Sequence, residues 1–95
     1  MVVTTVHRDS SPDEIRAWLI ERVAYYLELP ADNIDPDTEL AQYGLDSVYS
    51  MSIIAEIEDQ LQVKIDEMAA WKYPTINALV DYAENLISEP VHSAP

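Results

Sequence analysis

Apolar side chains recur every three or four positions in three separate stretches of this chain, and that periodicity limits the fold more than any other feature. A helix with a single apolar stripe must bury the stripe against another element, so several such helices imply a bundle. The chain has only 1 glycine, and no segment alternates for long as a strand would. Its 95 residues suffice for one small core. We therefore expect a single all-α domain.

Capping signals mark where two of the helices begin. Ser11, Pro12 and Glu14 form a capping box, with the serine as N-cap, the proline at the first helical position and the glutamate reaching back. Thr75, which follows a proline, is the expected N-cap of the last helix. The helical periodicity predicts a core made of Ile15, Trp18, Leu19, Val23, Tyr26, Leu27, Ser50, Ile53, Ile54, Ile57, Leu61, Ile76, Leu79, Val80, Ala83 and Leu86.

The remaining elements complete a small antiparallel four-helix bundle with three main helices and a short third one. The second main helix is predicted over 47–61, and the short helix near 66–70. A long polar loop over 29–46, rich in aspartate and proline, is expected to cross the end of the bundle. The chain is expected to divide into a flexible tail over 1–10, a domain over 11–88 and a second flexible tail over 89–95.

The charge balance excludes some classes of partner. The chain carries 5 Lys and Arg against 18 Asp and Glu, which argues against nucleic acid because phosphate binding needs cationic side chains. This acidity favours partners with basic docking surfaces, although it also suits a small protein that only needs to stay in solution. There is no cysteine, no signal peptide and no apolar run as long as a membrane span, so we expect a cytoplasmic monomer without membrane contact.

The inventory of reactive side chains does not favour an enzyme. The histidines are His7 and His92, both in the expected tails, so a serine nucleophile would lack a general base. Asp32, Asp35 and Asp37 offer a loose cation site at best, and solvated loop carboxylates explain them as well. One glycine cannot build a glycine-rich phosphate loop. We therefore expect no catalytic residue and no metal site.

Ser47 is the residue best placed for covalent modification. It lies between the long polar loop and the second helix, on a rigid and exposed element. The positive end of the helix dipole would stabilise a phosphate attached there. Helix capping by Ser47 or by Asp46 remains the alternative interpretation of both residues. Gly44 is expected to adopt a backbone angle closed to other residues.

Three segments resemble the acyl carrier protein family. The segment 43–47, Tyr-Gly-Leu-Asp-Ser, is similar to the Leu-Gly-Leu-Asp-Ser signature of that family, with Val48 in place of the usual leucine. The segment 71–75, Trp-Lys-Tyr-Pro-Thr, looks like the sequence before the last helix of modular-synthase carriers, and 29–40 resembles the family's first loop. The resemblance covers about 12–87 and implies a 4′-phosphopantetheine arm on Ser47, transferred from coenzyme A.

This resemblance implies a carrier that holds acyl intermediates as thioesters and performs no chemistry itself. Its partners would be a phosphopantetheinyl transferase, which would recognise Asp46, and an acyltransferase or ligase, a ketosynthase or another acyl-processing enzyme. The segment 71–75 and the acid-free 49–52 are closer to polyketide carriers than to fatty-acid carriers. The alternatives are a peptidyl or aminoacyl carrier of a nonribosomal peptide pathway and a helical interaction module without an arm.

A second stripe on the helix over 47–61 is the expected docking surface for these partners. Rotation by about 100° per residue places part of the exposed face on the same side as Ser47, away from the core stripe. For Val48 and Met51, packing under the long loop is the alternative. The stripe consists of Val48, Met51, Ala55, Glu58 and Asp59.

Overall fold

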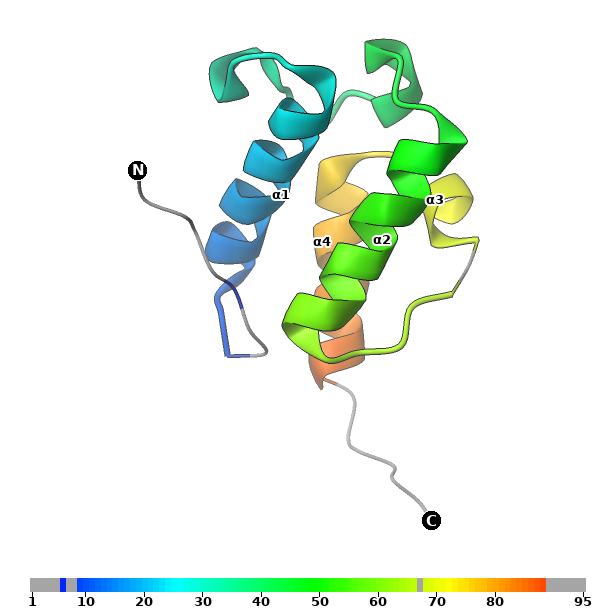
Figure 1. Ribbon diagram of the computed structural model, residues 1–95. Coiled ribbons are helices and arrows are strands. Elements are labelled where there is room, and N and C mark those ends of the chain that lie inside the picture. Colours follow the sequence, from blue (N-terminus) through cyan, green and yellow to red (C-terminus); the bar gives the residue numbers. More distant parts are fainter. Residues whose placement is uncertain (1–5, 7–8, 67, 89–95) are drawn as a thin grey trace.

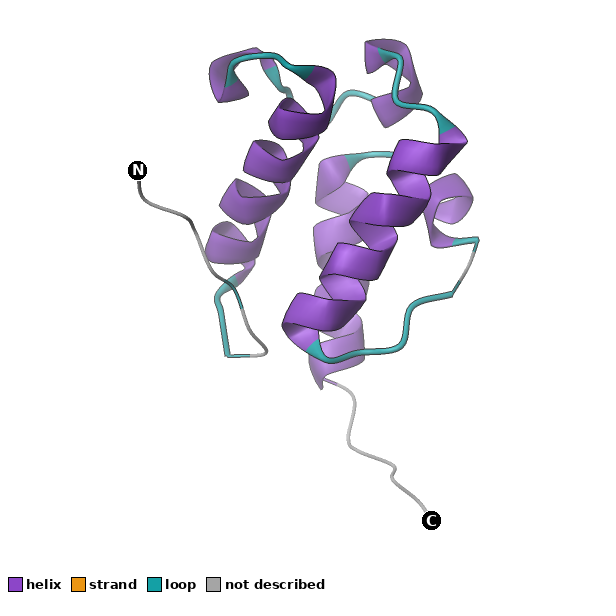
Figure 2. Cartoon of the chain, viewed as in Figure 1, coloured by secondary structure: helices purple, strands orange, loops and turns teal. Residues whose placement is uncertain are grey.

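The computed structural model, which describes residues 6, 9–66 and 68–88, is a helical bundle without strands in the described part of the chain (Figures 1 and 2). The all-α fold with three main helices and a short third one is confirmed. No helix in these ranges is both long enough and apolar enough to cross a membrane. The elements are α1 (Pro12–Leu27), the 3-10 helices η1 (Ala31–Asn33) and η2 (Leu40–Tyr43), α2 (Ser47–Leu61), α3 (Ala69–Lys72) and α4 (Ile76–Ser88).

The predicted capping signals hold α1 and α4 at their starts. The backbone N–H of Glu14 donates to Ser11 Oγ at 3.1 Å, and the backbone N–H of Ser11 donates to Glu14 Oε1 at 2.8 Å, which confirms the capping box. At α4 the backbone N–H of Ala78 donates to Thr75 Oγ1 at 3.1 Å, so Thr75 caps this helix as predicted. Helix α2 begins and ends where its periodicity indicated.

The third helix lies further along the chain than its predicted position near 66–70. It spans Ala69–Lys72 because Asp66 belongs to the turn that precedes it. One carboxylate oxygen of Asp66 accepts the backbone N–H of Met68 at 2.8 Å, and such a local side-chain bond competes with helical hydrogen bonding. Since the chain here offers only short apolar spacing, periodicity could not locate a four-residue helix.

The long loop crosses one end of the bundle, as expected, and is more structured than its composition indicated (Figure 1). It contains η1 and η2, which the sequence did not predict. The backbone N–H of Leu40 donates to the Pro74 carbonyl at 2.9 Å, and that of Asn77 donates to the Pro36 carbonyl at 3.0 Å. These bonds tie the loop to the junction of α3 and α4. Helix α1 runs opposite to α2 and α4, as the antiparallel prediction requires, whereas α4 departs from that prediction and runs in the same direction as α2 (Figure 1).

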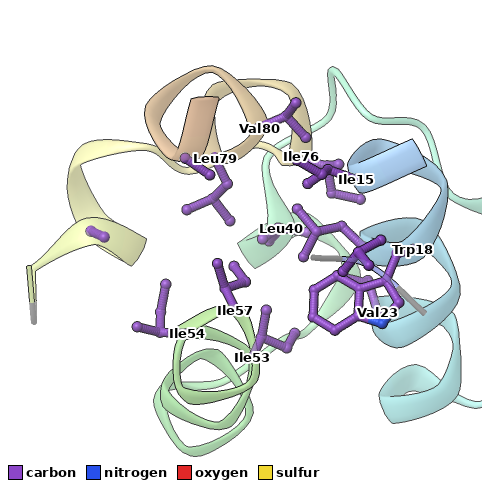
Figure 3. Close-up of a cluster of buried hydrophobic side chains, with 14 of the residues drawn as sticks. Ile15, Trp18, Val23, Leu40, Ile53, Ile54, Ile57, Ile76, Leu79 and Val80 are labelled. Atoms are coloured by element: carbon purple, nitrogen blue, oxygen red, sulfur yellow. The ribbon is translucent and has the colours of Figure 1, made fainter. Parts of the chain in front are cut away.

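The core lies between α1, α2 and α4 and contains the stripes that the periodicity predicted (Figure 3). Ile53 of α2 lies toward Trp18 of α1, whereas Ile54 lies on the side of α2 away from α1 (Figure 3). Ser50 and the outer stripe residues Tyr26, Leu27 and Leu86 are only half-buried. The connecting segments and α3 add buried side chains that periodicity could not identify: Ile34, Leu40, Leu45, Ile65 and Ala69.

Two residues of the expected N-terminal tail lie against the bundle. The side chain of Val6 is 2% exposed and belongs to the core cluster, and Ser10 is also buried. The remainder of the two expected tails, apart from the exposed Asp9, lies outside the described residues, and so do His7 and His92. Their flexibility therefore stays a prediction.

Candidate functional site

Ser47 is the first residue of α2 and is exposed. Asp46, not Ser47, caps the helix, because Asp46 Oδ1 accepts the backbone N–H of Tyr49 at 3.0 Å. The backbone carbonyl of Asp46 accepts the N–H of Ser50 at 2.9 Å. The Ser47 hydroxyl makes no hydrogen bond to any other described residue, so it is available for reaction.

The chain reaches Ser47 through a turn that depends on Gly44. Gly44 ends η2 with φ +87°, in the left-handed region that other residues rarely adopt, as expected. No atom lies within 4 Å of the position of an added Cβ, so the requirement is conformational and not steric. The next residue, Leu45, is buried in the core cluster. Gly44 and Leu45 therefore fix the direction from which the chain enters α2.

The first turn of α2 also provides a favourable environment for an anion. Backbone N–H groups in the first turn of a helix have no partner within the helix. Asp46 satisfies that of Tyr49, which leaves the N–H groups of Ser47 and Val48 for solvent or for a phosphate. The Asp46 carboxylate opposes an anion in part, and its Oδ2 makes no hydrogen bond within the described residues.

An open groove of about 870 Å³ runs along the side of α2 that faces α3; we call it the α2–α3 groove. Asp46 and Ser47 line it where α2 begins, and Lys64 lines it beyond the end of α2. The exposed side chains of Met51 and Trp71, which are 69% and 77% exposed, stand at its edge. Its buried lining is apolar and consists of Leu40, Leu45, Ile53, Ile54, Ile65 and Leu79. Sequence periodicity did not reveal this groove, because it is formed by segments distant in sequence.

The predicted docking stripe is exposed along most of its length. Val48 is 67% exposed and Met51 69%, so neither packs under the long loop. Ala55 and Asp59 are exposed as well. Glu58 differs, because its side chain is half-buried and its Oε2 accepts the backbone N–H of Ile65 at 2.7 Å. Glu58 therefore holds the segment after α2 and does not present a free carboxylate as Asp59 does.

The opposite side of α2 is held to α1 by a cluster that the sequence analysis missed; we call it the α1–α2 clamp, made of Arg22, Tyr26, Tyr49 and Glu56. Arg22 Nε donates to Glu56 Oε1 at 2.6 Å, and the Tyr26 hydroxyl donates to Glu56 Oε2. The rings of Tyr26 and Tyr49 lie 5.4 Å apart between centroids. Tyr49 and Glu56 are seven positions apart, a spacing that marks one side of a helix.

Hydrogen bonding within the clamp raises the pKa values of Tyr26 and Arg22. The bond to the Glu56 carboxylate, assisted by burial, raises the pKa of the Tyr26 hydroxyl above its usual 10.0. The bond between Arg22 and Glu56 raises the pKa of the Arg22 guanidinium in the same way, although desolvation opposes it. The raised pKa values of Arg22 and Tyr26 therefore favour the protonated forms that donate to Glu56.

Polar contacts at the turn before α3 hold this short helix against α4. The Tyr82 hydroxyl of α4 accepts the backbone N–H of Asp66 at 3.1 Å, and the ring of Tyr82 stacks on Tyr73 at 4.4 Å. Lys72 Nζ donates to Asp66 Oδ2 at 2.9 Å. The N–H of Met68, followed by Lys72, lowers the pKa of the Asp66 carboxyl. Trp71 takes no part in these contacts and remains at the groove edge.

The loop aspartates serve the loop itself. Asp35 Oδ1 accepts the backbone N–H of Asp37 at 2.9 Å, and Asp37 Oδ1 accepts Asn77 Nδ2 at 2.5 Å. Within residues 6, 9–66 and 68–88 no group of three or more His, Cys, Asp and Glu is arranged to hold a metal ion. Asp32 is exposed and makes no hydrogen bond among these residues. The side chains of Asp35 and Asp37 thus stabilise the loop and its attachment to α4.

The chain is similar to multidomain synthases over a small part of their length. A phenolphthiocerol/phthiocerol polyketide synthase of Mycobacterium tuberculosis is 32% identical over 73 residues, which are 77% of this chain. The chain spans only 4% of the length of that synthase polypeptide. The likeness therefore concerns one domain of the relative and not its whole activity.

Solved structures of carrier proteins match over nearly their full length. The acyl carrier protein LipD of Actinoplanes friuliensis is 39% identical with a TM-score of 0.71, and the match covers 93% of this chain and 98% of LipD. A free-standing peptidyl carrier protein of Acinetobacter baumannii is 35% identical with a TM-score of 0.71, covering 82% of this chain and 94% of the other. Both confirm the fold class predicted from the sequence.

A family match identifies the chemistry that this fold supports. Residues 17–83 match the phosphopantetheine attachment site family. The group that the family carries fits an exposed serine at a helix N-terminus beside an open groove, as described above for Ser47. Members are carrier domains that do not themselves catalyse a reaction. The chain belongs to this family and is a phosphopantetheine-carrying carrier protein related to the carrier domains of polyketide synthases.

Proposed function

We propose that Ser47 is the attachment residue, and that the chain holds acyl intermediates as thioesters on a 4′-phosphopantetheine arm and presents them to biosynthetic enzymes. The observation that carries this proposal is the exposed, unbonded hydroxyl of Ser47 at the first position of α2. The free N–H groups of Ser47 and Val48 favour a phosphodiester there, because they and the helix dipole attract negative charge.

The transfer of the arm requires a separate phosphopantetheinyl transferase. The Ser47 hydroxyl loses its proton to a base of that enzyme, and its oxygen bonds to the phosphorus that carries the pantetheine of coenzyme A. The pyrophosphate P–O bond breaks, and the adenosine bisphosphate leaves with the bonding electrons. Asp46 is suited to recognition by the transferase, because the cap uses Oδ1 and leaves Oδ2 unbonded.

Acyl-processing partners, such as an acyltransferase or ligase and a ketosynthase, would dock on the exposed stripe beside Ser47. Its apolar members are Val48, Met51 and Ala55. Two acids of α2 are already engaged, since Glu56 binds Arg22 and Glu58 binds the backbone of Ile65. Asp59, the third acid of α2, makes no side-chain hydrogen bond or ion pair within the described residues. Docking on α2 therefore relies on apolar contact more than on ion pairs.

Polyketide or related secondary-metabolite biosynthesis is the proposed context. Similarity to a polyketide synthase supports it, as does the aromatic segment 71–75 that resembles carriers of that class. The second candidate is a peptidyl or aminoacyl carrier, which the likeness to a free-standing peptidyl carrier protein favours. The aspartate at position 46 favours an acyl carrier over a peptidyl carrier, because histidine is frequent at that position in peptidyl carriers. We propose a cytoplasmic monomer in either case.

Intact mass spectrometry tests the proposed function. The protein is incubated with coenzyme A and a broad-specificity phosphopantetheinyl transferase, and we expect the mass to increase by one phosphopantetheine group. Ser47→Ala should abolish the increase and leave the helical circular dichroism spectrum unchanged. Addition that persists in Ser47→Ala, for example at Ser50 or Ser52, would overturn the assignment.

A further inference from the structure

The side of α2 that faces α1 is held at two points two turns apart. Near the start of the helix, the ring of Tyr49 packs on Tyr26 with centroids 5.4 Å apart and planes inclined by 35°. Further along, the carboxylate of Glu56 binds both the Tyr26 hydroxyl and Arg22, whose Nε lies 2.6 Å from Glu56 Oε1. Both attachments thus converge on Tyr26. Two attachments on one side of a helix fix its rotation about its own axis, which a single contact cannot do.

Tyr49 connects this clamp directly to the modification site. Its backbone N–H holds Asp46 Oδ1 at 3.0 Å, while its ring is held by Tyr26 of α1. Ser47 lies between these two residues in the first turn. The Tyr49 hydroxyl makes no hydrogen bond within the described residues, so the ring alone provides its contact with α1.

We propose that the α1–α2 clamp positions the first turn of α2 for arm transfer, and that Tyr49 is the positioning residue through which the clamp acts on Ser47 and Asp46. This inference rests on the proposed function. Tyr49 lies on the opposite edge of α2 from the groove that Ser47 lines, so it acts through the orientation of the helix and not by touching coenzyme A.

The other side of α2 cannot supply the same constraint. Within the described residues, its only side-chain hydrogen bond to the chain beyond the helix runs from Ile65 N–H to Glu58, near the far end. The first turn of α2 borders an open groove on that side. Without the Tyr49 ring, the first turn of α2 would lose its packing on α1, and only the buried Leu45, Ile53 and Ile54 would limit small rotations there. A misplacement of about 1 Å at the reacting atom can slow a reaction about 100-fold, so even a small rotation matters.

Initial rates of arm transfer test the inference. We would measure kcat and KM for the carrier as substrate of the transferase, with coenzyme A saturating. We expect Tyr49→Ala to lower kcat about tenfold with little change in KM. Tyr49→Phe, which keeps the ring, should retain the wild-type kcat. Tyr25→Ala is a second comparison variant, because Tyr25 is an exposed tyrosine whose ring contacts Tyr26 and Arg22 of α1; its loss of kcat should be smaller than that of Tyr49→Ala.

Several outcomes would overturn the positioning role. A folded Tyr49→Ala with unchanged kcat would do so, and so would a higher KM at constant kcat, which would mean that Tyr49 contacts the transferase itself. An equal loss in Tyr49→Phe, which keeps the ring that packs on Tyr26, would also contradict it. If Tyr49→Ala does not fold, Tyr26→Phe decides, since it removes only the hydroxyl bond to Glu56: a lowered kcat supports the clamp, and an unchanged kcat overturns it.

The end point of the same reactions separates this inference from the proposed function. After long incubation each folded variant should reach the mass of the fully modified protein, because Ser47 is intact in all of them. Absence of modification in the wild type would mean that the proposed function fails. Modification of every variant at the wild-type rate would mean that the positioning role alone fails.

Discussion

The two flanks of α2 are built differently. Toward α1 the helix is closed by side chains from both helices, with the ion pair of Arg22 and Glu56 and the packed rings of Tyr26 and Tyr49. Toward α3 it opens on a groove of about 870 Å³, edged by exposed apolar side chains such as Trp71. Ser47 stands where α2 begins and lines this groove.

This difference indicates how one helix can serve two purposes. A carrier must present its arm from a fixed position, and the closed flank provides rigid attachment to α1. It must also engage several partners in turn, and an open apolar flank can receive different surfaces. The short α3 borders the open flank: the turn before it bonds to Tyr82 of α4, Lys72 pairs with Asp66 of that turn, and Trp71 takes part in neither contact.

The largest predicted effect is on the free energy of unfolding, from substitutions in the core beneath α2. Two isoleucines of α2 allow the closed core and the groove side to be compared. Ile57→Ala should lower the free energy of unfolding by about 3–5 kcal/mol, because the side chain is 1% exposed and a closed cavity remains. Ile54→Ala should cost about 2–3 kcal/mol, since Ile54 is 9% exposed and lines the groove, where the surroundings can collapse. Urea unfolding measures both. An unchanged stability for Ile54→Ala, or a cost above that of Ile57→Ala, would mean that the faces of α2 are misassigned.

On the open flank, we predict that substitutions slow acyl transfer and leave the free energy of unfolding nearly unchanged. Val48→Asp and Met51→Glu should each slow acyl transfer to or from partner enzymes about tenfold, because a partner would bury an unpaired carboxylate. Their free energies of unfolding should stay within about 0.5 kcal/mol of wild type, since both side chains are largely exposed. Transfer assays and melting curves on the same samples give the comparison. Unfolding of Val48→Asp would place Val48 in the core.

On the closed flank, we predict a loss of stability when Glu56 is changed. Glu56→Gln weakens the bonds to Arg22 and Tyr26 and should lower the free energy of unfolding by about 1 kcal/mol, a modest value because the pair is partly exposed. Asp59→Asn is the matched control on the exposed face and should change stability by less than about 0.5 kcal/mol. Equal effects for the two variants would show that the clamp adds no stability.

The smallest expected effect is a pH dependence of the clamp. Because the pKa of Tyr26 is raised above 10.0 in the folded state, folding favours the protonated hydroxyl. This stabilisation is complete below pH 10.0 and is lost as the pH rises through the raised folded pKa. Unfolding at about pH 9 and about pH 11 should show a steeper decline for wild type than for Tyr26→Phe. Parallel declines would mean that Tyr26 does not titrate with folding.

Much of the fold could be predicted from the sequence because its signals are local. The capping box of Ser11 and Glu14 fixed the start of α1, and the apolar period gave the bounds of α2 and its buried face. The sequence also placed Asp46 as a possible cap and Gly44 in an unusual backbone angle.

The remainder could not be predicted because it depends on contacts between distant segments. The groove needs α2, α3 and the long loop together, and the clamp needs α1 to face α2 with Tyr26 between Tyr49 and Glu56. The position of α3 depends on a side-chain bond of Asp66 that periodicity does not report. The stripe prediction grouped Glu58 with Asp59, although a backbone N–H 7 residues further along engages Glu58.

Mapping of a bound partner by NMR tests the asymmetry of α2 most directly. Labelled carrier is titrated with the phosphopantetheinyl transferase, and the shifts of the backbone amides and of the Trp71 indole are followed. We predict that Val48, Met51 and Trp71 shift most, while Arg22 and Glu56 stay near their free positions. Dominant shifts at Arg22 and Glu56, with Met51 and Trp71 unchanged, would contradict the assignment of the open flank as the docking face.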